Sequence, residues 1–217
     1  MSPPSQRRRG LGAGRDLLGR LLSRLEPIAF PPTSDPAQHW QRQVLNDSIA
    51  AHLDGLGIES LSGAEISGGF HGGRDWGSYC SLDYPEFDLC AEPVRVGPFD
   101  VVLCEQVLEH VAAPWLAARN LRALGKPGAS IIVSTPFMIK LHELPQYRMY
   151  DYWRFTPRGL RTLLESAGLE VEQVRSWGNR ECVIGNLGDW SSYRRWHPLA
   201  NQPDLPVQVW AFARVPG

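Results

Sequence analysis

The hydrophobic positions of this chain fall into blocks with two different periods, and these blocks alternate along the sequence. Leu45, Ile49, Leu53 and Leu56 recur at helical spacing, which predicts an amphipathic helix that starts near Pro36 and ends at Gly55-Leu-Gly57. Further helical stripes lie at 114–124 and 157–167. Thr156 is expected to cap the second of these, with Pro157 at its first position.

Short apolar runs between these stripes predict strands. The runs lie at 64–67, 79–83, 100–104, 131–135, 169–174 and 207–212. Strands that alternate with helices favour a mostly parallel sheet covered on both faces, an α/β Rossmann-like sandwich of three layers. No helical stripe separates the last two strands, so we expect an antiparallel strand at one edge, with residues 206–213 returning there.

The chain divides into two parts by composition. Residues 1–35 begin with Pro, Ser, Gly and Arg and then carry Leu18, Leu21, Leu22 and Leu25 on one helical face. This basic tail with a short amphipathic helix fits packing on the domain or on a second subunit, so a homodimer stays open, and a membrane-surface helix is the alternative. Residues 36–217 form the predicted folded domain.

Overall charge and cysteine spacing limit the classes of function. The 217 residues carry a net charge of −1, which gives no reason to expect nucleic acid as the main partner, although Trp and Arg are dense between Ser176 and His197. The four cysteines have no CxxC spacing and are expected to be reduced. No apolar run has the length of a membrane span, and Arg7-Arg8-Arg9 precedes no apolar signal core, so we expect a cytoplasmic protein.

Polar residues follow most of the predicted strands at their carboxyl ends, where α/β folds bind ligands. Glu65 is followed by Ser67, Gly68 and Gly69, whose small side chains let a backbone approach a ligand closely. The remaining members of this series are Asp83, Tyr84, Asp88, Glu105, Gln106 and His110. An acidic residue after the second strand can accept from a ribose diol, and Tyr84 offers a flat face for a base.

These segments resemble class I S-adenosylmethionine (SAM) dependent methyltransferases, of the small bacterial kind grouped around the methyltransferase type 11 pattern. The resemblance covers roughly residues 40–213, and the stretches that carry it are AEISGG, YCSLDYPEFDLC, FDVVLCEQVLEHV, SIIVSTPF and DYWRFTPRGLRTLLESAGLEV. It implies SAM as cofactor, with 67–69 at the methionine part, Asp83 at the ribose, Asp88 at the adenine and Glu105-Gln106 at the sulfonium. In the family's first glycine motif, Ser67 stands at the first glycine position and His71 at the third.

The segment 136–156 has no clear periodicity and is expected to be a lid over the same edge of the sheet. Its candidate residues for binding a small-molecule acceptor, such as a sugar or secondary metabolite, are Tyr147, Tyr150, Tyr152 and Arg154. For O-methylation, which is favoured over N- or C-methylation, His142 is the first candidate base and His110 the second. No Asp/Asn pair follows the central strands, so no metal is expected. The alternatives are a catalytically silent scaffold and an enzyme that uses another nucleotide.

Overall fold

The structure is a computed structural model that describes residues 40–91, 94–187 and 200–217. Its centre is one six-stranded sheet with the strand order β2-β1-β3-β4-β6-β5. The strands are β1 (Ser62–Ile66), β2 (Ser78–Leu82), β3 (Phe99–Glu105), β4 (Gly125–Pro136), β5 (Glu170–Trp177) and β6 (Gln208–Arg214). The first four strands pair in parallel, and β6 is antiparallel to both of its neighbours.

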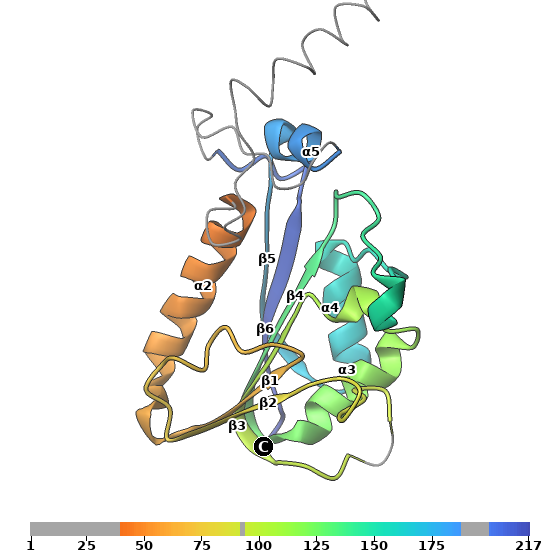
Figure 1. Ribbon diagram of the computed structural model, residues 1–217. Coiled ribbons are helices and arrows are strands. Elements are labelled where there is room, and N and C mark those ends of the chain that lie inside the picture. The colour runs from red at the N-terminus through yellow and green to blue at the C-terminus, as the bar shows by residue number, and fades with distance from the viewer. Residues whose placement is uncertain (1–39, 92–93, 188–199) are drawn as a thin grey trace, which may run out of the picture.

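Helices cover both faces of this sheet, which gives the three layers predicted from the sequence (Figure 1). Helix α2 (Trp40–Leu56) lies on one face, and α3 (Pro114–Leu124) and α4 (Pro157–Ser166) lie on the other. The remaining helices are α5 (Arg180–Leu187) and the one-turn 3-10 helices η2 (Ile58–Ser60), η3 (Leu108–His110) and η4 (Pro145–Tyr147). The Thr156 cap is confirmed, because its side-chain oxygen accepts from Gly159 N at 3.0 Å.

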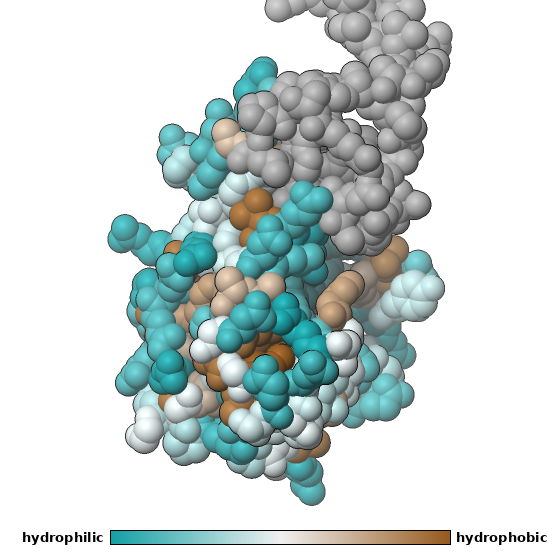
Figure 2. All heavy atoms as spheres, turned by 90° about the vertical axis from the view of Figure 1, so that its left-hand side faces the viewer, coloured by the Kyte–Doolittle hydropathy of each residue, from teal (hydrophilic) through white to brown (hydrophobic). Residues whose placement is uncertain are grey.

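Two hydrophobic cores lie on the two sides of the sheet, because successive strand residues point to opposite faces. In β3, Val102 and Cys104 belong to the core beneath α3 and α4, whereas Val101 and Leu103 belong to the core beneath α2. Of the predicted stripe of α2, Leu45, Ile49 and Leu53 are fully buried in the second core and Leu56 is partly buried, while Figure 2 shows mainly hydrophilic residues over that side of the molecule. A helix buried along one stripe is thus what the apolar spacing predicted.

The position of the last strand differs from the prediction. Strand β6 does not lie at the edge but between β4 and β5, so that β5 is the edge strand. A helix, α5, also lies between the last two strands, although no apolar stripe predicted a helix there. In the described part of the connections 67–77 and 83–98, no helix crosses from β1 to β2 or from β2 to β3. Loops therefore form these two connections of the sheet.

Two of the segments discussed from the sequence lie wholly or partly outside the described residues. The tail 1–35 with its leucine stripe lies outside the described residues, as does 188–199 of the Trp- and Arg-rich stretch. All four cysteines are free thiols, as predicted. Among the described residues, no helix has both the length and the apolar character needed to cross a membrane.

Candidate functional site

The glycine-rich loop after β1 is held by Glu65, which is the last residue but one of that strand. Its two carboxylate oxygens accept from the backbone N–H groups of Phe70 and His71, each at 3.1 Å, and from the Tyr79 hydroxyl at 2.6 Å. A Cβ at Gly68 would lie 2.5 Å from Glu65 Oε1, so any larger residue there would displace the Glu65 carboxylate. Glu65 therefore shapes the loop, and its oxygens face the protein's own donors.

The same loop is tied to β3 through a buried ion pair. His71 Nε2 lies 2.6 Å from Glu105 Oε1, and Arg42 of α2 approaches Glu105 Oε2 at 3.5 Å. Arg42 also lies over the ring of Phe70, 5.6 Å from its centroid. Two buried atoms of this group, Arg42 NH1 and Glu105 Oε2, have no hydrogen-bond partner within the described residues. The cluster thus places next to the glycine loop one donor and one acceptor atom that make no hydrogen bond among the described residues.

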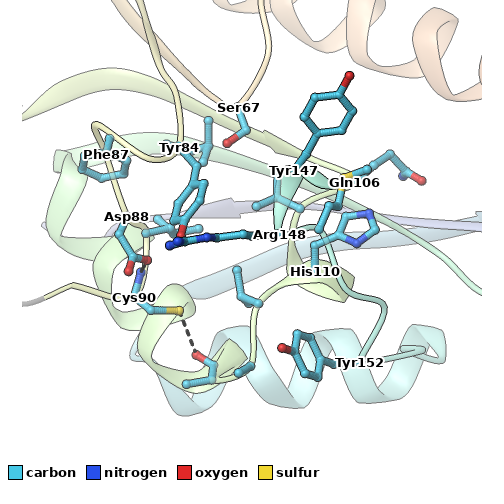
Figure 3. A pocket seen from close by; sticks show the side chains of 17 residues that line it. Ser67, Tyr84, Phe87, Asp88, Cys90, Gln106, His110, Tyr147, Arg148 and Tyr152 are labelled. Atoms are coloured by element: carbon cyan, nitrogen blue, oxygen red, sulfur yellow. Dashed lines mark hydrogen bonds between the residues drawn. The ribbon is translucent and has the colours of Figure 1, made fainter. Parts of the chain in front are cut away.

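A pocket of about 450 Å³ opens beside these residues, at the carboxyl ends of β1 and β3. Figure 3 shows how its side chains lie, with Arg148 extending across the cavity toward Tyr84 and Asp88. The polar and aromatic lining residues are Ser67, Tyr84, Phe87, Asp88, Gln106, His110, Tyr147, Arg148 and Tyr152. This volume lies within the range of about 300–1,000 Å³ that is typical of small-molecule sites.

The backbone around the pocket takes a restricted conformation at two predicted cofactor residues. Ser67 has φ 51° and Gln106 has φ 56°, in the left-handed region that few residues other than glycine adopt. Gln106 is held there by its side-chain amide, which donates to Ser134 Oγ at 3.0 Å and to Gln208 Oε1 at 2.9 Å. Backbone strain of this kind gathers at functional sites, which supports the assignment of this edge as the site.

Other predicted cofactor residues lie less directly on the pocket. Asp88 lines it, with one oxygen accepting from Cys90 N at 2.8 Å. Asp83 is not among the lining residues, and its side chain accepts from Ser81 Oγ at 2.9 Å. Gly68, Gly69 and Glu105 also lie outside the lining, in the loop and ion pair already described. The ribose role of Asp83 therefore stays a prediction.

The predicted lid 136–156 is an irregular segment that contains η4 and is docked onto η3. Tyr152 N donates to Glu109 O at 2.7 Å, and the Trp153 indole donates to Val111 O at 2.9 Å. Of the predicted acceptor residues, Tyr147 and Tyr152 line the pocket, whereas Tyr150 does not. Both terminal nitrogens of Arg154 bind the buried carboxylate of Asp151, so this arginine holds the segment together and does not face the pocket.

The two predicted bases, His110 and His142, lie side by side at this docking point. Their ring centroids are 4.9 Å apart, but only His110 lines the pocket. His142 Nδ1 lies 3.1 Å from Asp151 Oδ2. Burial lowers the pKa of His142, although Asp151 opposes that shift. Burial alone would raise the pKa of Asp151, but the hydrogen bond and charge of Arg154 outweigh it and lower that pKa.

Sequence reasoning did not single out Glu109 as a functional residue. This side chain is fully buried beneath the lid, and burial raises the pKa of its carboxyl to about 8. Neither of its oxygens has a hydrogen-bond partner in another described residue. His71 was likewise noticed only as a departure from a glycine motif, because its partner Glu105 lies 34 residues away. Nothing in the local sequence reveals such burial or pairing.

The fold is that of the class I SAM-dependent methyltransferases, as the resemblance implied. Residues 14–174 match the family Methyltransf_23, described as a methyltransferase domain, and the chain therefore belongs to that family. Curated relatives include the ubiquinone biosynthesis O-methyltransferase of Ralstonia nicotianae, 34% identical over 110 residues, which are 44% of this chain and 46% of that protein. The protein of the same name from Marinobacter nauticus is 29% identical over 143 residues, 57% of each chain. The chain thus spans about half the length of the curated relatives that it matches.

Solved structures support the fold. The 1,6-didemethyltoxoflavin-N1-methyltransferase of Burkholderia thailandensis, bound to 1,6-didemethyltoxoflavin and S-adenosylhomocysteine, has a TM-score of 0.53 at 15% identity and covers 100% of this chain and 93% of its own. The [4+2]-cyclase SpnF has a TM-score of 0.54 at 14% identity, with 92% and 95% coverage. Since the same fold occurs in a cyclase, the fold alone does not define the reaction.

Proposed function

We propose that this protein transfers a methyl group from SAM to a hydroxyl group of a small aromatic molecule. The observation that carries the proposal is the series of polar groups at the carboxyl ends of β1 and β3, gathered around one pocket of about 450 Å³ in a chain of the methyltransferase domain family. SAM is the cofactor of that class. The relatives named O-methyltransferases support oxygen as the acceptor atom.

The polar groups beside the pocket suit the two ends of SAM. A buried donor on Arg42 and a buried acceptor on Glu105, both without hydrogen-bond partners, are complementary to the carboxylate and ammonium of its methionine part. Tyr84 and Asp88 line the pocket, where they supply an aromatic face and a carboxylate for the adenine. Gln106 and Ser67, at the ends of β3 and β1, lie between these two regions along the site edge.

The reaction itself needs alignment and exclusion of water more than covalent chemistry. A lone pair of the acceptor oxygen forms the new bond to the methyl carbon, the carbon–sulfur bond breaks, and sulfur keeps that electron pair as S-adenosylhomocysteine. The hydroxyl releases one proton. Tyr147, Tyr152 and Met149 of the lid line the pocket and offer an aromatic and apolar wall for the acceptor ring.

Isothermal titration with SAM tests the cofactor part of the proposal. Asp88→Asn should weaken SAM binding by roughly 10- to 150-fold, because one charge-assisted hydrogen bond contributes about 1.5–3 kcal/mol. Glu86→Gln is the matched control, an exposed carboxylate two residues away that does not line the pocket and should bind SAM as the wild type does. Absence of binding by the wild type at millimolar SAM would refute the proposal.

A catalytically silent scaffold is the second candidate, and the departure from the family's glycine motif, with Ser67 at its first glycine position, favours it. The two candidates differ in product formation. Incubation with SAM and a panel of phenols, sugars and amines, followed by mass spectrometry, should show a mass gain of one methylene on a phenol. SAM binding without any methylated product would favour the scaffold.

A further inference from the structure

One cluster beside the pocket has the composition of a metal site. Glu109, His110 and His142 each offer one ligand atom, and these three atoms lie within 4.8 Å of one another. We propose that they bind one divalent transition-metal ion, of the kind represented by Zn²⁺ or Co²⁺. Ligand atoms around a tetrahedral ion at its usual bond lengths lie roughly 3.4 Å apart. His110 Nε2 and Glu109 Oε1 are already 3.8 Å apart, so small side-chain movements complete the site.

The carboxylate of Glu109 supplies an independent argument. It is 0% exposed and has no hydrogen-bond partner in another described residue, although buried polar groups are nearly always paired. The ring nitrogen Nε2 of His110 lies 3.8 Å from Glu109 Oε1, beyond hydrogen-bond distance. A divalent cation between the carboxylate and the two imidazoles provides the interaction that this carboxylate lacks.

Both histidines are held in place by the lid, and His110 is held in the way that metal ligands are held. A ligating histidine usually donates its second ring N–H to a carbonyl or carboxylate, which fixes the ring and its tautomer. His110 Nδ1 is within hydrogen-bond distance, 2.7 Å, of the carbonyl oxygen of Tyr150. His142 is held through its backbone N–H, which donates to Asp151 Oδ2 at 3.0 Å, and its Nδ1 lies 3.1 Å from the same oxygen without the geometry of a hydrogen bond. Asp151 is in turn fixed by Arg154. The docking of the lid onto η3 therefore orients the proposed ligands.

The ligand types favour one group of ions. Two imidazoles and one carboxylate suit zinc and other first-row transition metals, whereas magnesium prefers oxygen ligands. Three protein ligands leave at least one coordination position for an outside molecule. His110 is both a proposed ligand and part of the pocket lining, so the ion lies next to the space where the acceptor binds.

This site refines the proposed function, on which its role in the reaction rests. A hydroxyl oxygen of the acceptor that binds the ion loses its proton more readily, because the positive charge stabilises the oxyanion. His110 and His142 then act as ligands, and not as the bases that the sequence suggested. The substrate class becomes a phenolic hydroxyl that can reach the ion. The sequence expectation of no metal had considered only an Asp/Asn pair and not this set.

The metal itself is the probe in the decisive experiment. The full chain is treated with EDTA, dialysed and titrated with Co²⁺, followed by its visible absorption, and with Zn²⁺ by calorimetry. One ion per chain with a micromolar or tighter Kd is expected. Glu109→Gln should weaken binding at least tenfold, while the matched control Glu59→Gln, an exposed carboxylate in η2, should not. Wild-type protein that binds neither ion at 1 mM overturns the proposal, as does Glu109→Gln protein with wild-type affinity.

A second variant and a second ligand keep the test informative. If Glu109→Gln does not fold, His142→Gln replaces it, since that side chain is partly exposed and should likewise lose Co²⁺ binding. SAM binding, measured on the same samples, separates the two proposals. If the wild type binds SAM but no metal ion, the metal site alone is refuted. If the wild type does not bind SAM, the methyltransferase proposal is refuted, and the metal titration is then judged separately.

Discussion

The hydrogen bonds of Glu65 allow one substitution to be analysed in detail. Glu65→Gln keeps the shape of the side chain but replaces one acceptor oxygen by an N–H₂ donor. If the remaining oxygen keeps the bond to Phe70 N, the new donor faces His71 N, which now lies 3.1 Å from a carboxylate oxygen. The hydroxyl of Tyr79 can rotate and accept instead of donating, so that contact survives in weaker form.

The magnitude follows from these contacts. Leaving a buried N–H without a partner costs about 1–3 kcal/mol, and a neutral bond in place of a charge-assisted one loses about 1 kcal/mol more. The free energy of unfolding should therefore fall by about 2–4 kcal/mol. The glycine loop is then less ordered before binding. If ordering it takes about 1.4 kcal/mol from the binding energy, SAM binds about tenfold more weakly.

Urea denaturation and calorimetric titration with SAM measure the two effects. Tyr79→Phe is the matched control, because it removes one donor from the same carboxylate and leaves both loop amides bound. It should cost about 1–2 kcal/mol of stability with little change in SAM affinity. Wild-type stability and wild-type SAM affinity in Glu65→Gln would refute the idea that this carboxylate shapes the loop.

Three further predictions concern stability away from the pocket. Thr156→Ala should lower the free energy of unfolding by about 1 kcal/mol through loss of the α4 cap, with Thr156→Ser near the wild type in urea. Leu164→Ala, at a fully buried position of α4, should cost about 2–5 kcal/mol in the same assay. Hydrogen bonds from Lys126 and Ser62 lower the pKa of Asp100 to about 2. Stability from this group is therefore present above about pH 4 and lost as the pH falls toward 2. Lys126→Met should destabilise the protein at pH 5 but much less at pH 2, and an equal difference at both values would contradict the assignment.

The local part of the fold was predictable from the sequence, whereas the order of the strands was only partly so. Apolar period and capping residues gave α2, α3, α4 and all six strands, because side-chain spacing reports which face is buried. The insertion of β6 between β4 and β5 depends on pairing across long sequence separations, which no local pattern records. α5 was missed because its buried residues, such as Cys182 and Asn186, form no apolar stripe.

For the candidate site too, local features were predictable from the sequence, whereas long-range contacts were not. Ser67, Tyr84, Asp88, Gln106 and His110 were predicted from their place after strands, and all of them line the pocket. The contacts that arrange the site were not predictable, because they join distant segments. The lid residue His142 contacts His110 only because the lid 136–156 docks onto η3. Their combination with a buried glutamate emerges only in three dimensions.

The place of β6 in the sheet has a consequence for the order of events during synthesis. β5 has one strand neighbour in the described sheet, β6, and the two pair from Glu170–Arg214 to Trp177–Gln208. A nascent chain that has reached residue 177 therefore contains a complete β5 with no place to pair. Until residues 208–214 have left the ribosome, the exposed edge of β4 and the unpaired β5 are both open to wrong partners. The sheet of this protein is thus expected to be completed only after residues 208–214 have emerged.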